Sequence, residues 1–196
     1  MNKVLDQLLI RKHRGYYLKY ICLIHEIEVK TLVEIGVFRG KNAAVLRELF
    51  PEAHLYLIDP WAPTPEYLGS GSAVSEDLAV YEKAHRRVLQ LFENDPQVTL
   101  IQKTSSEAAP LLPDHLDLVF IDANHAYENV KRDILTYLPK VRSGGILSGH
   151  NYGRKRLPGV KKAVQELFED HFLLGQDEVW CYFKGPNSRV NSAGPQ

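Results

Sequence analysis

Short apolar runs alternate with amphipathic segments along most of this chain of 196 residues. Five of the runs are apolar almost throughout and are bounded by polar residues, Gly or Pro. They predict buried strands at 31–37, 53–60, 98–102, 116–122 and 144–150. Apolar positions three and four apart predict helices at 42–50, 76–94, 105–112, 127–138 and 159–170. Two short segments, 172–176 and 178–184, predict a closing hairpin.

The alternation of strands and helices is typical of an α/β domain with a parallel sheet. Because the strands are apolar almost throughout, we expect helices on both faces of the sheet, as in a Rossmann-like, doubly wound fold. Ligands of such folds bind outside the carboxyl ends of the strands. The first functional candidates therefore lie at residues 36–40, 59–61, 104–106, 122–125 and 150–152.

The two ends of the chain differ from this central pattern. Residues 1–30 predict a helical extension of one or two amphipathic helices, with a break at Gly15. The apolar stripe of this extension suits either a lid over a pocket or a contact in a homodimer. Residues 31–184 form the predicted α/β domain. Residues 185–196 have little apolar content and predict a flexible tail.

Composition narrows the classes of function. The 24 Lys and Arg residues balance 24 Asp and Glu residues, so neither nucleic acid nor a membrane is an expected partner. Charged residues interrupt residues 1–17, which excludes a signal peptide or a membrane span there. The two cysteines, Cys22 and Cys181, form no CxxC pair, and this favours a reducing, cytoplasmic location.

The first two predicted strand ends carry features of nucleoside binding. Gly36 and Gly40 lie in the turn "VEIGVFRGKN", where missing side chains let the backbone approach a ligand. Phe38 takes the place of the second glycine of GxGxxG, which argues against a nicotinamide dinucleotide. Asp59 ends the next strand and can accept hydrogen bonds from both ribose hydroxyls. Trp61 follows and could stack on an adenine. Ordinary strand–helix turn chemistry is the alternative.

These stretches resemble the class I S-adenosylmethionine-dependent methyltransferases over about residues 30–184. The resemblance is carried by "VEIGVFRGKNA", "LYLIDPW", "KTSSEAAPLL", "LDLVFIDANHAYENVKRDI" and "VRSGGILSGHNY". Within that class, the chain is most similar to the small metal-dependent O-methyltransferases of the catechol O-methyltransferase and macrocin O-methyltransferase types. The resemblance implies a seven-stranded, mostly parallel sheet, in which the C-terminal hairpin supplies the antiparallel strand.

The resemblance also implies a site for S-adenosylmethionine. Glu34, Gly36 and Asn42 would lie by the methionine part of this cofactor. Phe38 and Gly40 belong to the same predicted cofactor-binding turn.

The other end of the implied cofactor site involves later strands. Asp59 would hold the ribose, and Trp61 and Ser105 would flank the adenine. Asp122, at the end of the fourth strand, also belongs to the predicted cofactor set. The spacing from Gly36 to Asp59 is common to the whole class, so it identifies the cofactor better than the methyl acceptor.

The ends of the fourth and fifth strands predict a metal site. Asp122 ends one strand, His150 and Asn151 end the other, and neighbouring strands lie about 4.8 Å apart. The catechol-type enzymes carry Asp, Asp and Asn here, which suits magnesium. His150 departs from that pattern, so manganese, iron or zinc would suit the set at least as well. Alternatively, Asp122 orders the following turn, His150 hydrogen bonds to the backbone, and no metal binds.

His125 lies three residues after Asp122, where the catechol-type enzymes carry a lysine base. The reference pKa of histidine, about 6.5, allows it to accept a proton near neutral pH. The sequence therefore makes His125 the candidate general base. The alternative is that Asn124 caps the next helix and that His125 is an exposed residue of its first turn.

The predicted function is methyl transfer from S-adenosylmethionine to a hydroxyl of a small molecule. A nicotinamide-dependent oxidoreductase and a non-catalytic cofactor-binding protein are the alternatives. Residues 62–75, rich in Pro, Gly and Ser, could be a lid or a linker. Residues 151–162 carry five basic residues, which suit either a solvated loop or a site for an anionic acceptor.

Overall fold

A computed structural model describes residues 3–68 and 75–186 of the chain. The strands are β1 (Thr31–Ile35), β2 (His54–Ile58), β3 (Val98–Ile101), β4 (Leu116–Ile121), β5 (Val141–Gly149), β6 (Leu173–Leu174) and β7 (Trp180–Phe183). The helices are α1 (Lys3–Ile10), α2 (Arg14–Ile24), α3 (Lys41–Leu49), α4 (Pro65–Leu68), α5 (Leu78–Phe92), α6 (Ser105–Ala108), α7 (Tyr127–Tyr137) and α8 (Pro158–Phe168). Two 3₁₀ helices are η1 (Ala109–Leu111) and η2 (Leu138–Lys140).

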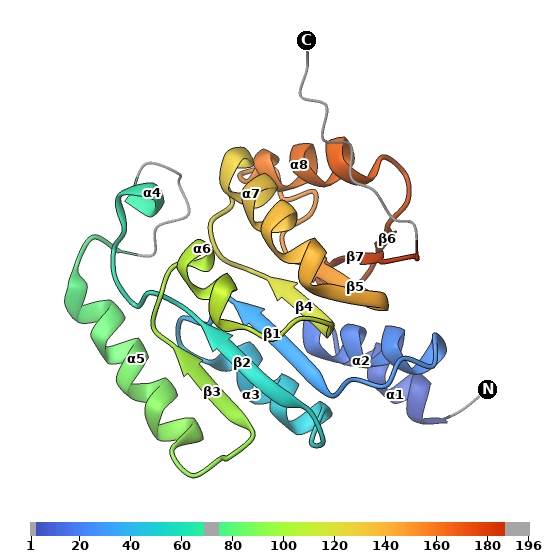
Figure 1. The fold of residues 1–196 in the computed structure, drawn as a ribbon, viewed down its shortest axis with the longest axis horizontal. Helices are drawn as coiled ribbons and strands as arrows, with labels where there is room; N and C mark the ends of the chain where they lie inside the picture. Colours follow the sequence, from blue (N-terminus) through green and yellow to red (C-terminus); the bar gives the residue numbers. More distant parts are fainter. Residues whose placement is uncertain (1–2, 69–74, 187–196) are drawn as a thin grey trace.

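The strands form one seven-stranded sheet in the order β3-β2-β1-β4-β5-β7-β6 (Figure 1). The first five strands are parallel, and β7 pairs antiparallel with both β5 and β6. The chain moves outward from β1 to β3 and then returns to β4 on the other side of β1. The predicted Rossmann-like fold with a C-terminal antiparallel hairpin is confirmed.

Helices cover both faces of the sheet. One apolar core joins the sheet to α2, α3 and α5, and a second core joins it to α7 and α8. Leu32 and Val33 follow one another in β1, and both are fully buried, one in each core. Because successive strand residues point to opposite faces, a strand covered on both sides is mostly apolar, as Leu32, Val33 and Ile35 of β1 are.

Backbone pairing fixes the carboxyl edge of the sheet. Gly36, Asp59, Asp122 and His150 each follow a strand directly, and each donates its backbone N–H to the last residue of the neighbouring strand. The four hydrogen bonds measure 2.8–3.3 Å between nitrogen and oxygen. These residues, far apart in the sequence, are therefore held along one edge, with the reversal of strand order between β1 and β4 at its centre.

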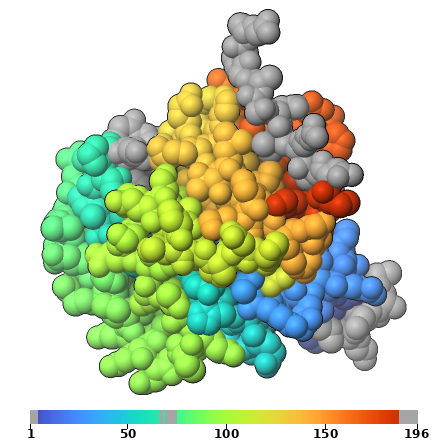
Figure 2. Space-filling model, viewed as in Figure 1, coloured from blue at the N-terminus to red at the C-terminus, as the bar shows by residue number. Residues whose placement is uncertain are grey.

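The N-terminal helices pack onto the domain. Helix α1 ends before residues 11–13, and Gly15 lies buried in the first turn of α2, so the predicted break at Gly15 is wrong. A Cβ atom on Gly15 would lie 2.8 Å from Cγ1 of Val45, and this shows how closely α2 approaches α3. Figure 2 shows the blue N-terminal segment against the orange and red C-terminal segments, where the rings of His25 and Phe183 are 4.4 Å apart.

Some expectations fall outside the described residues. Residues 69–74 of the predicted lid or linker and residues 187–196 of the predicted tail are among these. The roles of α1 and α2 as a lid or a homodimer contact stay predictions. No helix within residues 3–68 and 75–186 is long and apolar enough to cross a membrane.

Candidate functional site

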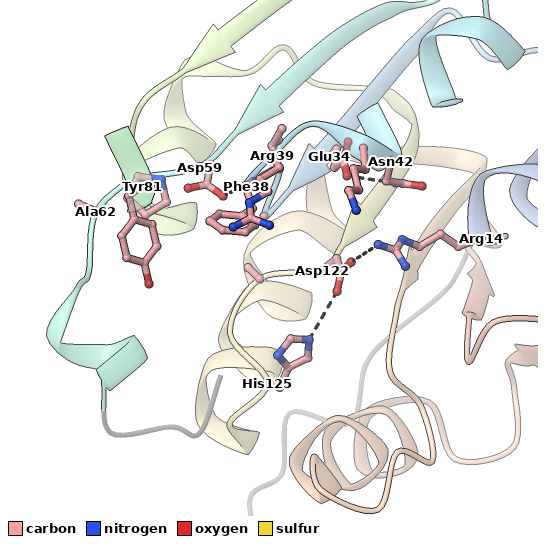
Figure 3. Close-up of a pocket in the computed structure, with 15 residues that line it drawn as sticks. Arg14, Glu34, Phe38, Arg39, Asn42, Asp59, Ala62, Tyr81, Asp122 and His125 are labelled. Atoms are coloured by element: carbon pink, nitrogen blue, oxygen red, sulfur yellow. Dashed lines mark hydrogen bonds and ion pairs between the residues drawn. The ribbon is translucent and has the colours of Figure 1, made fainter. Parts of the chain in front are cut away.

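A cavity of about 300 Å³ opens at the carboxyl edge of the sheet. The ends of β1, β2 and β4 line it, together with residues from the starts of α2 and α3 and with Tyr81 of α5. Figure 3 shows Asp59 and Tyr81 at one end of the cavity and Glu34, Asn42 and Arg14 toward the other. A cavity of this volume suits a small-molecule ligand.

The structure gathers many of the residues that the sequence singles out. The predicted residues that line the cavity are Glu34, Gly36, Phe38, Asn42, Asp59, Asp122 and His125. The described residues that line the cavity do not include five other predicted site residues: Gly40, Trp61, Ser105, His150 and Asn151. The cofactor-binding roles of Gly40, Trp61 and Ser105 stay predictions.

The two glycines of the β1–α3 turn are required by packing. Gly36 has φ +92°, and a Cβ atom there would lie 2.2 Å from the carbonyl oxygen of Asp122. Gly40 has φ +71° and faces Val88 and Leu91 of α5. Both backbone conformations favour glycine. The glycines thus let the turn lie tightly between β4 and α5, which places the residues around them at the cavity.

Glu34 and Asn42 form a buried polar pair at one end of the cavity. The Asn42 side-chain nitrogen donates to Oε1 of Glu34 at 3.1 Å. Oε2 of Glu34 and Oδ1 of Asn42 are buried and have no hydrogen-bond partner. Burial raises the pKa of Glu34 to about 8, although the hydrogen bond from Asn42 opposes the shift. Each unpaired oxygen can accept a hydrogen bond from a ligand that carries N–H donors.

Asp59 lies at the other end and is fixed by the backbone. Its Oδ2 accepts the N–H of Phe38 at 2.8 Å, and its Oδ1 accepts the N–H of Trp61 at 2.7 Å. Burial raises the pKa of Asp59, and these backbone hydrogen bonds oppose that rise. Each carboxylate oxygen can accept a further hydrogen bond, so the side chain can receive two hydroxyls.

Trp61 and Ser105 lie near the cavity without lining it. The Trp61 indole is buried, donates to the carbonyl of Phe38 at 2.8 Å, and stacks on His85. Ser105 lines a smaller hollow of about 30 Å³ that shares Gly36 with the main cavity. Its hydroxyl donates to Asp133 at 2.6 Å.

The turn after β4 brings Asp122 and His125 together. His125 Nε2 lies 3.5 Å from Oδ1 of Asp122, as drawn in Figure 3. Burial opposes ionisation of Asp122, but hydrogen bonds with His125 and His150 and the charge of Arg14 lower its pKa to about 2. Oδ1 of Asn124 accepts the N–H of Ala126 at 2.9 Å and so shapes the turn, although the N-cap of α7 is Ala126 itself.

His150 and Asn151 complete a polar cluster around Asp122. His150 Nδ1 lies 3.4 Å from Oδ1 of Asp122. In the orientation that satisfies both ends of the Asn151 amide, its nitrogen donates to Nε2 of His125 at 2.6 Å and to Oδ1 of Asp122 at 3.3 Å. In that orientation the amide oxygen accepts from Nη1 of Arg154 at 2.9 Å.

Arg14 was not singled out by the sequence, yet it reaches the same cluster. Its Nη2 lies 3.3 Å from Oδ2 of Asp122, and its Nη1 lies 3.4 Å from Nε2 of His150. Within the described parts of the chain, no group of three or more His, Cys, Asp or Glu side chains is placed to hold a metal ion. With a guanidinium already paired to Asp122, the predicted set of Asp122, His150 and Asn151 does not fit a divalent ion.

No local sequence signal identifies Arg14, because one charged residue at the start of an amphipathic helix is ordinary. Lys41, which also lines the cavity, was likewise missed, whereas Arg39 lies within the candidate range 36–40. The position of Lys41 directly after the turn that carries Gly36 and Gly40 could have indicated it. In the predicted basic segment, residues 154–156 and 161–162 are exposed, and Arg154 lies 3.7 Å from Glu178.

Comparison with known proteins adds to this geometry. Residues 33–152 match a family model described as a methyltransferase domain. The chain is 25% identical over 163 residues to an uncharacterized protein of Acanthamoeba polyphaga mimivirus, covering 78% of this chain and 67% of that protein.

Solved structures show a similar fold. The O-methyltransferase NovP superimposes with a TM-score of 0.63 and 19% identity, over 92% of this chain and 79% of that chain. An O-methyltransferase from Bacillus cereus in complex with SAH superimposes with a TM-score of 0.60 and 15% identity, over 94% and 92% of the two chains. At such identities the likeness shows the fold alone.

Proposed function

Because this chain belongs to the methyltransferase-domain family, we propose that it transfers a methyl group from S-adenosylmethionine to a hydroxyl oxygen of a small molecule. S-adenosylmethionine supplies a methyl group already activated on a positively charged sulfur. The protein must therefore bind that cofactor, orient the acceptor and remove a proton. The SAH bound to the similarly folded Bacillus cereus protein supports this choice of cofactor.

The buried oxygens of Glu34 and Asn42 carry the proposal. An amino-acid ammonium group has three N–H donors, and such donors suit buried oxygens that lack a hydrogen-bond partner. A buried carboxylate without a partner is costly, and a charged donor lowers that cost by pairing with it. The methionine part of the cofactor carries such an ammonium group, and Glu34 and Asn42 would hold it.

Asp59 would hold the ribose of the same cofactor. Its oxygens are oriented by the N–H groups of Phe38 and Trp61, and it lines the cavity at the end away from Arg14. The two ends of the cavity thus differ in the groups they recognise: one accepts from an ammonium and the other from hydroxyls. A nucleoside joined to an amino acid matches both.

His125 is the proposed general base. It lines the cavity beside Asp122, and an imidazole that takes up a proton becomes positively charged. The ionised carboxylate of Asp122, 3.5 Å away, would stabilise that charge. As the acceptor oxygen bonds to the methyl carbon, the bond from that carbon to sulfur breaks and His125 takes the hydroxyl proton. General base assistance of this kind contributes about 10²–10⁴-fold to a rate.

A thermal-shift panel tests the proposed cofactor. The purified protein is melted with S-adenosylhomocysteine, with NAD and with NADP, each alone. A ligand that binds only the folded state raises the melting temperature. We expect S-adenosylhomocysteine to raise it and the nicotinamide cofactors to leave it unchanged. Stabilisation by NAD or NADP without stabilisation by S-adenosylhomocysteine would overturn the proposal in favour of an oxidoreductase.

A further inference from the structure

Arg14 is held in place by the packing of its helix. The first turn of α2 is capped by His13, whose Nδ1 accepts the N–H of Gly15 at 3.1 Å. The backbone N–H of Arg14 itself donates to Oδ2 of Asp177 at 3.1 Å. Leu18, one turn further along, is fully buried. The start of α2 is therefore fixed both to the sheet core and to the loop before β7.

The guanidinium of Arg14 bridges two elements of the site. Besides the contact with Asp122 at 3.3 Å, its Nη1 lies 3.4 Å from Nε2 of His150 and 3.5 Å from Oδ2 of Asp177. Its Nε is buried without a hydrogen-bond partner, and the side chain lines the cavity. Arg14 thus joins the ends of β4 and β5 from a third direction, as Figure 3 shows for its approach to Asp122.

These contacts determine how His150 can act. Arginine nitrogens are always donors, so Nε2 of His150 accepts in the contact with Arg14. The other ring nitrogen, Nδ1, lies 3.4 Å from Oδ1 of Asp122. The competing contact from Nε2 to Asp177 is 3.6 Å, which is longer than a hydrogen bond. Both nitrogens of His150 are therefore engaged, and neither is available to a metal.

A divalent ion would also meet the charge of Arg14. An ion bound to Asp122 would lie next to a guanidinium that contacts the other oxygen of the same carboxylate. Like charges at such a distance repel strongly in a partly buried site. The guanidinium already supplies the positive charge that a metal ion would bring to this cluster, and its N–H groups hold the Asp122 carboxylate.

We propose that Arg14 is the resident cation of this site, that it takes the place of a divalent metal, and that methyl transfer proceeds without one. The part of this inference that concerns methyl transfer rests on the proposed function. Arg14 acts as a positioning residue: its contact with Oδ2 holds the Asp122 carboxylate oriented beside His125. In this way α2 completes the site, and the N-terminal extension belongs to the catalytic unit.

A titration with Mn²⁺ tests the proposal and needs no methyl acceptor. The electron paramagnetic resonance signal of free Mn²⁺ measures how much of the ion is bound. The full-length wild type is compared with Arg14→Met, which keeps the length of the stem but loses the charge, and with Arg14→Lys, which keeps the charge. We expect no stoichiometric Mn²⁺ on the wild type or Arg14→Lys. Arg14→Met should bind one ion, with an affinity more than about tenfold higher, because the repulsion is gone.

The double variant Arg14→Met with Asp122→Asn locates the ion, since loss of the carboxylate should abolish Mn²⁺ binding. The proposal would be overturned if the wild type bound one Mn²⁺ ion and the single substitution Asp122→Asn abolished that binding. This outcome can be observed even if the Arg14 variants do not fold. Absence of Mn²⁺ from a folded Arg14→Met would overturn it too, because Arg14 would not then be what excludes the ion. Affinity for S-adenosylhomocysteine on the same samples reports separately on the proposed function.

Discussion

Binding of S-adenosylhomocysteine should strengthen as the pH rises from 6 to 8, because Glu34 must ionise to pair with the ligand's ammonium group. The pKa of Glu34 is raised to about 8 by burial. Below that pH the free protein holds Glu34 protonated, whereas contact with an ammonium favours the ionised form. Binding therefore releases a proton, and linkage requires the affinity to increase with pH over this range.

The size of the change in affinity follows from the raised pKa of Glu34. Ionising a group costs about 1.4 kcal/mol for each pH unit below its pKa, so the affinity should change by up to about tenfold per unit. Between pH 6 and pH 7 the full slope is expected, and it should flatten near pH 8. Glu34→Gln keeps the shape of the side chain but cannot ionise. It should lose the pH dependence and, at pH 8, lose affinity worth about 1.5–3 kcal/mol from a charge-assisted hydrogen bond.

Isothermal titration calorimetry in buffers of different ionisation enthalpy measures both the affinity and the proton release. 5′-Methylthioadenosine is the matched control ligand, because it keeps the nucleoside and lacks the amino-acid part. Its affinity should not depend on Glu34 or on the pH. A wild-type affinity for S-adenosylhomocysteine that is flat from pH 6 to 8, with no proton released, would refute the pairing of Glu34 with the ammonium group.

Three further predictions concern the general base and two residues that stabilise the fold around the site. His125→Ala should leave the affinity for S-adenosylhomocysteine nearly unchanged and lower turnover by about 10²–10⁴-fold, measured as methyl transfer to an acceptor found by screening; unchanged turnover would remove its role as base. Gly36→Ala places a Cβ atom 2.2 Å from the carbonyl oxygen of Asp122 at a positive φ, and should cost more than about 2 kcal/mol of unfolding free energy in urea. Asp117→Ala removes the carboxylate that pairs with Arg142 and accepts backbone N–H groups at the start of β1, and should cost about 3–5 kcal/mol; a change below 1 kcal/mol in either urea titration would contradict the packing argument.

The sequence predicts the sheet well because both of its faces are covered. Strands such as β1 and β4 are mostly apolar, and the amphipathic stripes between the strands have the period of a helix. Glycines at positive φ, such as Gly36, and acids that directly follow a strand, such as Asp59, also leave a local signal. The fold and the methyltransferase family could therefore be anticipated from patterns within short stretches of chain.

The details of the site could be predicted less well. The sequence places Trp61 beside an adenine, but whether its indole faces a cavity or is buried depends on what packs around it. It is buried and stacked on His85, a residue of α5. Similarly, the sequence lists His150 as a metal ligand from its place after β5, and that placement at the carboxyl edge is as expected. The partners of its ring nitrogens are set by other segments.

The sequence by itself determined the order of strands and helices along the chain and the edge at which Asp59, Asp122 and His125 lie. These follow from local periodicity and from the rule that parallel strands end at one edge. The cofactor class was implied by the resemblance to the class I methyltransferases. Only the tertiary structure decided that Arg14, more than a hundred residues before Asp122, would pair with it. That pairing depends on how α2 docks against α3 and the loop before β7, and long-range packing of this kind leaves no periodic trace in the sequence.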